Sequence, residues 1–149
     1  MKLLTILIFS LAMKSMACDC TGSPFLRSTQ NSALVVLVEI ESQEVSSVKV
    51  KINELIKGAE KRKQVKVQGD RGADCLSSIR ELKPGTRWIM ALEKDSSFSG
   101  DYQLSSCGHH YAKVEKDNVI GFLNHTYLES KMLEKLPIDE IKKRIKSTH

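Results

Sequence analysis

Four cysteines constrain the fold of this 149-residue chain more than any other feature, and they stand at positions 18, 20, 75 and 107. A bridge between Cys18 and Cys20, with one residue between them, would close a strained small ring, so we exclude that pairing. Both remaining pairings join the segment around residues 18–20 to Cys75 and to Cys107. If all four cysteines are oxidised, this early segment is held against two later parts of the chain.

The first seventeen residues predict a secretory signal peptide. Met1 and Lys2 form a basic start, residues 3–13 are almost entirely apolar, and small side chains follow at Ser15 and Ala17. Eleven apolar residues are too few for the roughly 20 of a transmembrane helix. We therefore expect residues 1–17 to be removed and residues 18–149 to form a single secreted domain, extracellular or, in a bacterium, periplasmic.

Two covalent modifications depend on secretion and on the type of host. A bacterial lipoprotein is also cut before a cysteine, although its signal usually has leucine three residues earlier, where this chain has Ser15. Lipidation at Cys18 is therefore an alternative to a free terminus. In a eukaryotic host, residues 124–126 (Asn-His-Thr) would form an N-glycosylation sequon.

The charge of the chain argues against a nucleic-acid partner. Removing Lys2 and Lys14 with the leader reduces the formal net charge from +5 to +3. The strongest basic run, residues 60–63, has no interleaved aromatic residue and is typical of a solvated loop. We expect a monomer that binds no nucleic acid, and no membrane unless Cys18 is lipidated.

Short strands dominate the predicted secondary structure. Alternating or apolar β-rich runs cover residues 33–41, 48–52, 65–67, 86–93 and 102–106, with a turn signal at residues 83–85. Five strands at such short intervals are typical of a small sandwich or barrel. Residues 118–124 predict a last short strand, and residues 21–32 an irregular segment or one short helix.

The C-terminal region predicts a helix. After Pro137, the side chains of Ile138, Ile141 and Ile145 share one helical face, and acidic residues occupy the first turn. One short apolar stripe favours packing against the barrel over lying on a membrane surface.

No catalytic or metal-binding pattern is evident. The possible metal ligands, which are Cys18, Cys20, Cys107, His109 and His110, lack the spacing of a structural zinc site, and an oxidising compartment favours disulfides. We expect the two histidines to be ordinary surface residues. The chain has no C-x-x-C motif, serine triad or paired carboxylates, so we expect neither an enzyme nor a cofactor.

A set of cysteines and strand segments carries a resemblance to a known family. They are Cys18-Asp19-Cys20, Leu34–Val36, Ile56–Gly58, Cys75, Trp88–Ala91 and Cys107. Together they resemble the tissue inhibitors of metalloproteinases, specifically the N-terminal netrin-like domain and its shorter microbial and invertebrate relatives. The resemblance extends from Cys18 to about Tyr111, and its most specific element is the C-x-C after the leader with the two later cysteines.

The resemblance implies a mainly β fold, a five-stranded Greek-key OB-fold barrel of the netrin-like type. With it we expect one or two flanking C-terminal helices, in a helical extension from about residue 125. The family pairing implies disulfides Cys18–Cys75 and Cys20–Cys107. The third bridge of the family domain has no cysteines here, and the tail after Tyr111 lacks the further cysteine-rich domain of the vertebrate forms.

The resemblance also implies a function, which is inhibition of zinc metalloendopeptidases. The free amine and the carbonyl oxygen of Cys18 would chelate the catalytic zinc of the protease, displacing the water that attacks substrate. Asp19, Cys20 and Thr21 would lie along the substrate cleft. Residues 73–75 (Ala73, Asp74 and Cys75) would form the neighbouring edge of the same ridge.

One position departs from the family pattern. The family usually has threonine or serine where this chain has Asp19, and that side chain enters a commonly apolar pocket of the protease. Burying an unpaired carboxylate is costly. Asp19 therefore predicts a weak inhibitor or a target with a basic pocket. The alternative function is a netrin-like binding module without inhibitory activity, which would be lipid-anchored if Cys18 is lipidated.

Overall fold

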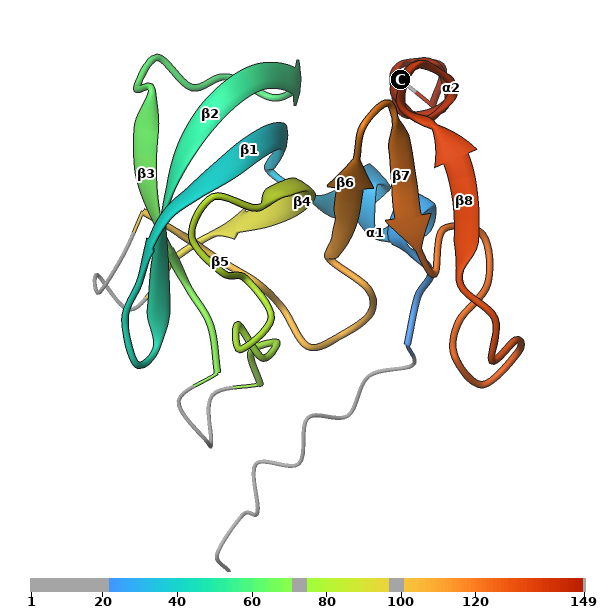
Figure 1. Cartoon of the computed structure of the whole chain (residues 1–149), viewed down its shortest axis with the longest axis horizontal. Helices are drawn as coiled ribbons and strands as arrows, with labels where there is room; N and C mark the ends of the chain where they lie inside the picture. Colours follow the sequence, from blue (N-terminus) through green and yellow to red (C-terminus); the bar gives the residue numbers. More distant parts are fainter. Residues whose placement is uncertain (1–21, 71–74, 97–100, 149) are drawn as a thin grey trace, which may run out of the picture.

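The computed structural model describes residues 22–70, 75–96 and 101–148, in which eight strands and two helices are formed (Figure 1). In chain order these elements are α1 (Phe25–Asn31), β1 (Leu34–Gln43), β2 (Ser47–Lys57), β3 (Gln64–Gln68), β4 (Arg87–Lys94), β5 (Tyr102–Gln103), β6 (Tyr111–Glu115), β7 (Asn118–Gly121), β8 (Glu134–Pro137) and α2 (Ile138–Lys146).

Strands β1 to β5 close a barrel. Neighbouring strands follow the order β1-β2-β3-β5-β4, and β4 pairs back onto β1. The pairing of β3 with β5 is parallel, through Val67 with Tyr102 and Gln68 with Gln103, whereas the other barrel pairings are antiparallel. This closed five-stranded arrangement is OB-fold-like and confirms the predicted fold class.

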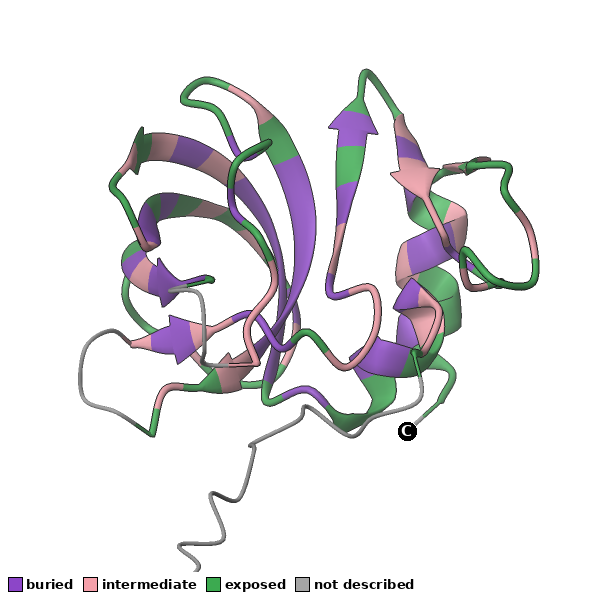
Figure 2. Cartoon of the chain, turned by 90° about the horizontal axis from the view of Figure 1, so that it is seen from below, coloured by how far each residue is buried: buried purple, intermediate pink, exposed green. Residues whose placement is uncertain are grey.

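Two apolar cores lie on opposite sides of the barrel wall. In β1, Leu34 and Val36 point into the barrel, while Val35 and Leu37 point outward to a second core that the helices cover. The same alternation separates Met90 from its outward neighbours in β4. A strand buried on both faces is apolar throughout, which explains the continuous apolar run of residues 34–38. All five side chains are buried, and Figure 2 shows long buried stretches within the barrel strands.

Strand β4 pairs with β1 along one edge, and two different strands pair with its other edge. Glu93 and Lys94 pair with β5, and residues 87–90 pair with β6. Between the two strands, residues 104–110 leave the ladder, and the chain returns to it where the backbone N–H of Ala91 donates to the carbonyl of His110 at 2.8 Å. From β6 the sheet continues antiparallel through β7 to β8.

The predicted C-terminal helix is confirmed, because α2 buries Ile138, Ile141 and Ile145 in the outer core. The second flanking helix, α1, lies near the start of the described chain and contacts α2, so only one described flanking helix is C-terminal. Strands β6 and β8 were not predicted. The strand predicted at residues 102–106 is limited to β5, because the ladder ends after Gln103.

Neither described helix has the length and apolar character required to cross a membrane.

Candidate functional site

The predicted inhibitory residues fall mostly outside the described chain. Cys75 is described; the others, which are Cys18, Asp19, Cys20, Thr21, Ala73 and Asp74, lie outside the described residues. The site is therefore built from Cys75, from Cys107, and from the segments that the structure brings beside them. Both of these cysteines are in disulfide form. Cys18 and Cys20, with which the resemblance pairs them, are outside the described residues, so the pairing stays a prediction.

The segments that carry the two described cysteines lie side by side. Leu76 and Ser105 form an isolated antiparallel bridge, and the backbone N–H of Ser106 donates to the carbonyl of Cys75 at 3.0 Å. The backbone N–H of Cys107 donates to the Ser105 hydroxyl at 3.1 Å. Cys75 adopts a left-handed backbone with φ 52°, which is uncommon outside glycine. We call residues 75–77 and 105–109, with Ser23, the cysteine junction.

Ser77 ties the junction to the barrel. Its backbone N–H donates to the carbonyl of Leu104 at 2.8 Å, and its hydroxyl donates to the carbonyl of Ser105 at 2.6 Å. In turn, the backbone N–H of Leu104 donates to the carbonyl of Gln68 at the end of β3. Each backbone hydrogen bond contributes roughly 1 kcal/mol when part-buried. The two cysteines belong to connecting segments, and the hydrogen bonds of Ser77 and Leu104 join these segments to the end of β3.

The start of the described chain enters the same junction. The backbone N–H of His109 donates to the carbonyl of Ser23 at 2.8 Å. Gly108 has φ +134°, and a Cβ there would lie 2.8 Å from the Ser28 hydroxyl oxygen, 2.9 Å from the Ser23 carbonyl oxygen and 3.0 Å from the Ser23 nitrogen. Only glycine allows the two backbones to approach this closely. Ser23 is therefore held directly beside the segment that carries Cys107.

Helix α1 continues the attachment of this early segment. The backbone N–H groups of Phe25 and Leu26 donate to the carbonyls of Phe122 and Leu123 at 2.8 and 3.1 Å. Phe25 is completely buried in the outer core. At the other end of α1, the ammonium of Lys57 donates to the carbonyls of Thr29 and Gln30 at 2.9 and 2.7 Å. A cation at this end satisfies orphan carbonyls and complements the helix dipole, while burial lowers the pKa of Lys57.

The two histidines, which were predicted to be surface residues, differ in their burial. His110 is buried, and its Nδ1 lies 3.1 Å from the carbonyl oxygen of Ala91. His109 is half-buried and packs on the ring of Phe122 with centroids 4.6 Å apart. Burial and, secondarily, the adjacent His110 lower the pKa of His109. The surface assignment was wrong for His110, because the chain folds back onto β4 at this position.

A groove of about 520 Å³ opens beside the junction. Ser77 and His109 line its junction end, and Phe122 and Leu133 belong to its apolar lining. Tyr111 also lines the groove, where its hydroxyl lies 2.6 Å from a carboxylate oxygen of Glu81. Burial and this hydrogen bond raise the pKa of Tyr111 well above its usual range. The groove combines an apolar wall with a few fixed polar groups, as binding surfaces commonly do.

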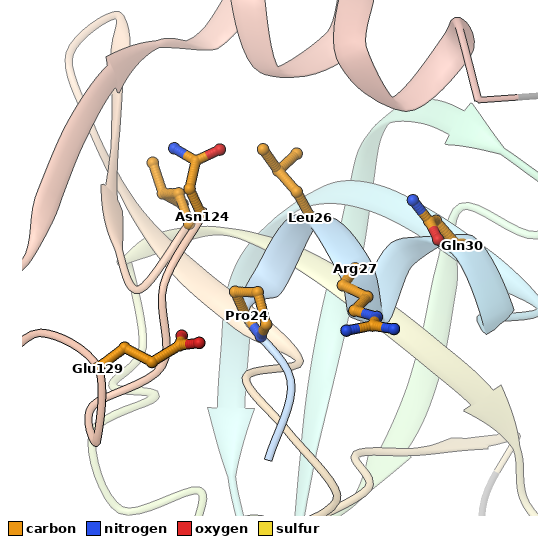
Figure 3. Close-up of a pocket in the computed structure, with 7 residues that line it drawn as sticks. Pro24, Leu26, Arg27, Gln30, Asn124 and Glu129 are labelled. Atoms are coloured by element: carbon orange, nitrogen blue, oxygen red, sulfur yellow. The ribbon is translucent and has the colours of Figure 1, made fainter. Parts of the chain in front are cut away.

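A second hollow, of about 360 Å³, lies between the α1 segment and the β7–β8 connection (Figure 3). Pro24, Leu26, Leu123 and Asn124 line it, with Glu129 from the same connection as Asn124. The connection itself exposes four large apolar side chains, whose exposed fractions are Tyr127 55%, Leu128 94%, Met132 77% and Leu133 58%. Within the described residues, no group of three or more His, Cys, Asp or Glu side chains is arranged to hold a metal ion.

Comparison with known proteins adds no assignment: no protein-family model matches this sequence, and no curated protein matches it. The likeness to the metalloproteinase inhibitors therefore rests on the cysteine pattern and the strand segments.

Three residues that position the site were not predicted from the sequence. Ser23, Lys57 and Gly108 act through contacts between segments far apart in the chain, which no local pattern reports.

Proposed function

We propose that the chain is a secreted, monomeric inhibitor of zinc metalloendopeptidases, acting through a free Cys18 terminus. The observation that carries the proposal is the meeting of Ser23, Cys75 and the Cys107 segment at one junction on the barrel. Cys20 precedes Ser23 by three residues, and three extended residues span at most about 11 Å. Ser23, which follows the early segment in the chain, is therefore held beside the segments that carry the two described cysteines.

The chemistry requires a terminus that is held in place. An α-amine and the carbonyl of the same residue form a five-membered chelate on a metal ion with an open coordination position. An α-amine has a pKa of about 7.7–8.0, so an appreciable fraction is neutral near pH 7, and metal binding releases the remaining proton. A loose terminus would lose conformational entropy on binding. A terminus already held by disulfides and by Ser23 loses less.

The proposed target contact extends along the early segment. Asp19, Cys20 and Thr21 would occupy the cleft of the protease, with Ala73, Asp74 and Cys75 beside them. Because a buried carboxylate needs a partner, Asp19 favours a target whose main pocket is basic or a weak inhibitor of proteases with an apolar pocket. Replacing Asp19 with threonine is expected to strengthen inhibition of the apolar-pocket class.

The deciding experiment changes the terminus and leaves the fold intact. Adding one alanine before Cys18 of the oxidised mature protein is expected to weaken inhibition of a susceptible zinc metalloendopeptidase by at least about 100-fold, roughly 2.8 kcal/mol. The matched control adds one alanine after His149, where we expect no effect. Mass spectrometry of the secreted chain should find an unmodified Cys18 amine. Unaltered inhibition by the extended chain, or a diacylglyceryl group on Cys18, would show that chelation is not the mechanism.

A second candidate is a binding module that inhibits no protease, and the exposed apolar side chains of the β7–β8 connection favour it. Large exposed apolar groups close together commonly mark protein interaction sites. The test uses correctly oxidised protein with a free Cys18 amine against a broad panel of zinc proteases. If it inhibits none of them, the binding module is favoured over the protease inhibitor.

A further inference from the structure

Residues 124–126 stand in an exposed turn of the β7–β8 connection. Asn124 is exposed, and so is the following His125. The backbone N–H and the hydroxyl of Thr126 both donate to one carboxylate oxygen of Glu129, at 2.7 and 3.1 Å, which closes the turn. N-linked glycosylation needs an Asn-x-Thr or Asn-x-Ser triplet on an accessible surface segment. The structure provides both the triplet and its exposure.

The carboxamide of Asn124 is oriented by two neighbours. Its Nδ2 donates to Glu134 Oε1 at 2.6 Å, and its Oδ1 accepts from the guanidinium of Arg144 at 3.0 Å. A carboxamide nitrogen has two N–H donors. Attachment of a sugar replaces one of these hydrogens, and the other remains available to Glu134. Glycosylation is therefore compatible with the native contacts of this side chain.

We propose that Asn124 carries an N-linked glycan. The donor is an oligosaccharide linked to a polyprenyl pyrophosphate. A bond forms between Asn124 Nδ2 and C1 of the sugar as the bond from C1 to the pyrophosphate oxygen breaks. The Nδ2 proton passes to a base, and the lipid pyrophosphate is the leaving group. The proposal rests on the secretion expected from the leader and is independent of protease inhibition.

The test translates the full chain in the presence of endoplasmic-reticulum microsomes. We expect cleavage of the leader and one glycan-sized mass increase that peptide N-glycosidase removes. Thr126→Ser keeps both the acceptor triplet and a hydroxyl for Glu129, so it should still be modified. Thr126→Ala destroys the triplet and should abolish the increase.

The outcomes separate the two proposals. A processed chain without the mass increase overturns glycosylation at Asn124, while the inhibitory terminus is unaffected. A chain that is neither processed nor modified overturns both glycosylation and the proposed secretion. A mass increase that persists in Thr126→Ala places the modification elsewhere and overturns the assignment to Asn124.

Discussion

The close approach of Gly108 to Ser23 can be tested by replacing Gly108 with alanine. The backbone at φ +134° is strained for any L-residue, at a cost of about 1–3 kcal/mol. The new Cβ would also lie within 3.0 Å of two Ser23 backbone atoms, and overpacking of this kind costs about 1–3 kcal/mol. The reduced freedom of the unfolded chain offsets about 0.4–1 kcal/mol. We expect Gly108→Ala to lower the free energy of unfolding by roughly 1–5.5 kcal/mol.

Urea unfolding of the oxidised protein measures this loss. For a slope near 2 kcal/mol per M, the midpoint should fall by about 0.5–2.8 M. Gly85 provides the matched control, because its φ of +81° imposes backbone strain while a Cβ there would have nothing within 4 Å. We expect Gly85→Ala to cost about 1 kcal/mol. If Gly108→Ala costs no more than Gly85→Ala, crowding against Ser23 is unimportant and the reasoning about the junction is wrong.

Two further predictions concern groups that hold the barrel and its helix. Lys57→Met removes the donor to the carbonyls of Thr29 and Gln30 and should lower the free energy of unfolding by about 1–2 kcal/mol, with faster hydrogen exchange in α1 as the local readout. Hydrogen bonds from Arg62 lower the pKa of Glu60 to about 2, so Glu60 stabilises the fold fully above its unfolded pKa near 4.5. This stabilisation should disappear as pH falls from about 5 to 2. The urea midpoint of Glu60→Gln should therefore change less over that pH range than the midpoint of the unmodified protein. If the two midpoints depend equally on pH, Glu60 is not the group responsible.

The barrel strands were predictable because each buries one face or both. Alternation at Val48, Val50 and Ile52 marked β2, and the stripe of Ile138, Ile141 and Ile145 marked α2. These patterns arise from burial within a single element, so the local sequence reports them.

The elements that were missed depend on distant partners. Strand β8 has one inward-facing apolar residue, Leu136, and becomes a strand only by pairing with β7. Strand β6 alternates over five residues, too few for a distinct signal, and is ordered by β4 on one side and β7 on the other. Tertiary pairing outweighs local propensity in such short segments.

The candidate site was predictable only in part, for the same physical reason. The sequence identifies Cys75 and Cys107 as candidate disulfide cysteines. Their separation along the chain does not predict that the two segments lie side by side. Their proximity follows from the Leu76–Ser105 bridge, which exists because the barrel brings the ends of β3 and β5 together. The burial of His110 likewise depends on its return to β4.

The backbone irregularities near the two cysteines favour a functional role for the junction over a purely structural one. If β5 continued directly into β6 as one strand, more backbone N–H and C=O groups of β4 would have a hydrogen-bond partner in the sheet. Instead, residues 104–110 leave the sheet, Gly108 has a φ of +134°, and Cys75 adopts a φ of 52°. Barrel closure requires none of these features, since β4 closes the barrel through its pairing with β1. Their shared effect is to bring the Cys75 and Cys107 segments together and to hold Ser23 beside them. Locally unfavourable backbone that serves one arrangement is expected where that arrangement has a function. The junction is therefore the part of the described chain where small substitutions should impair the proposed function, and Gly108→Ala should also lower the stability of the fold.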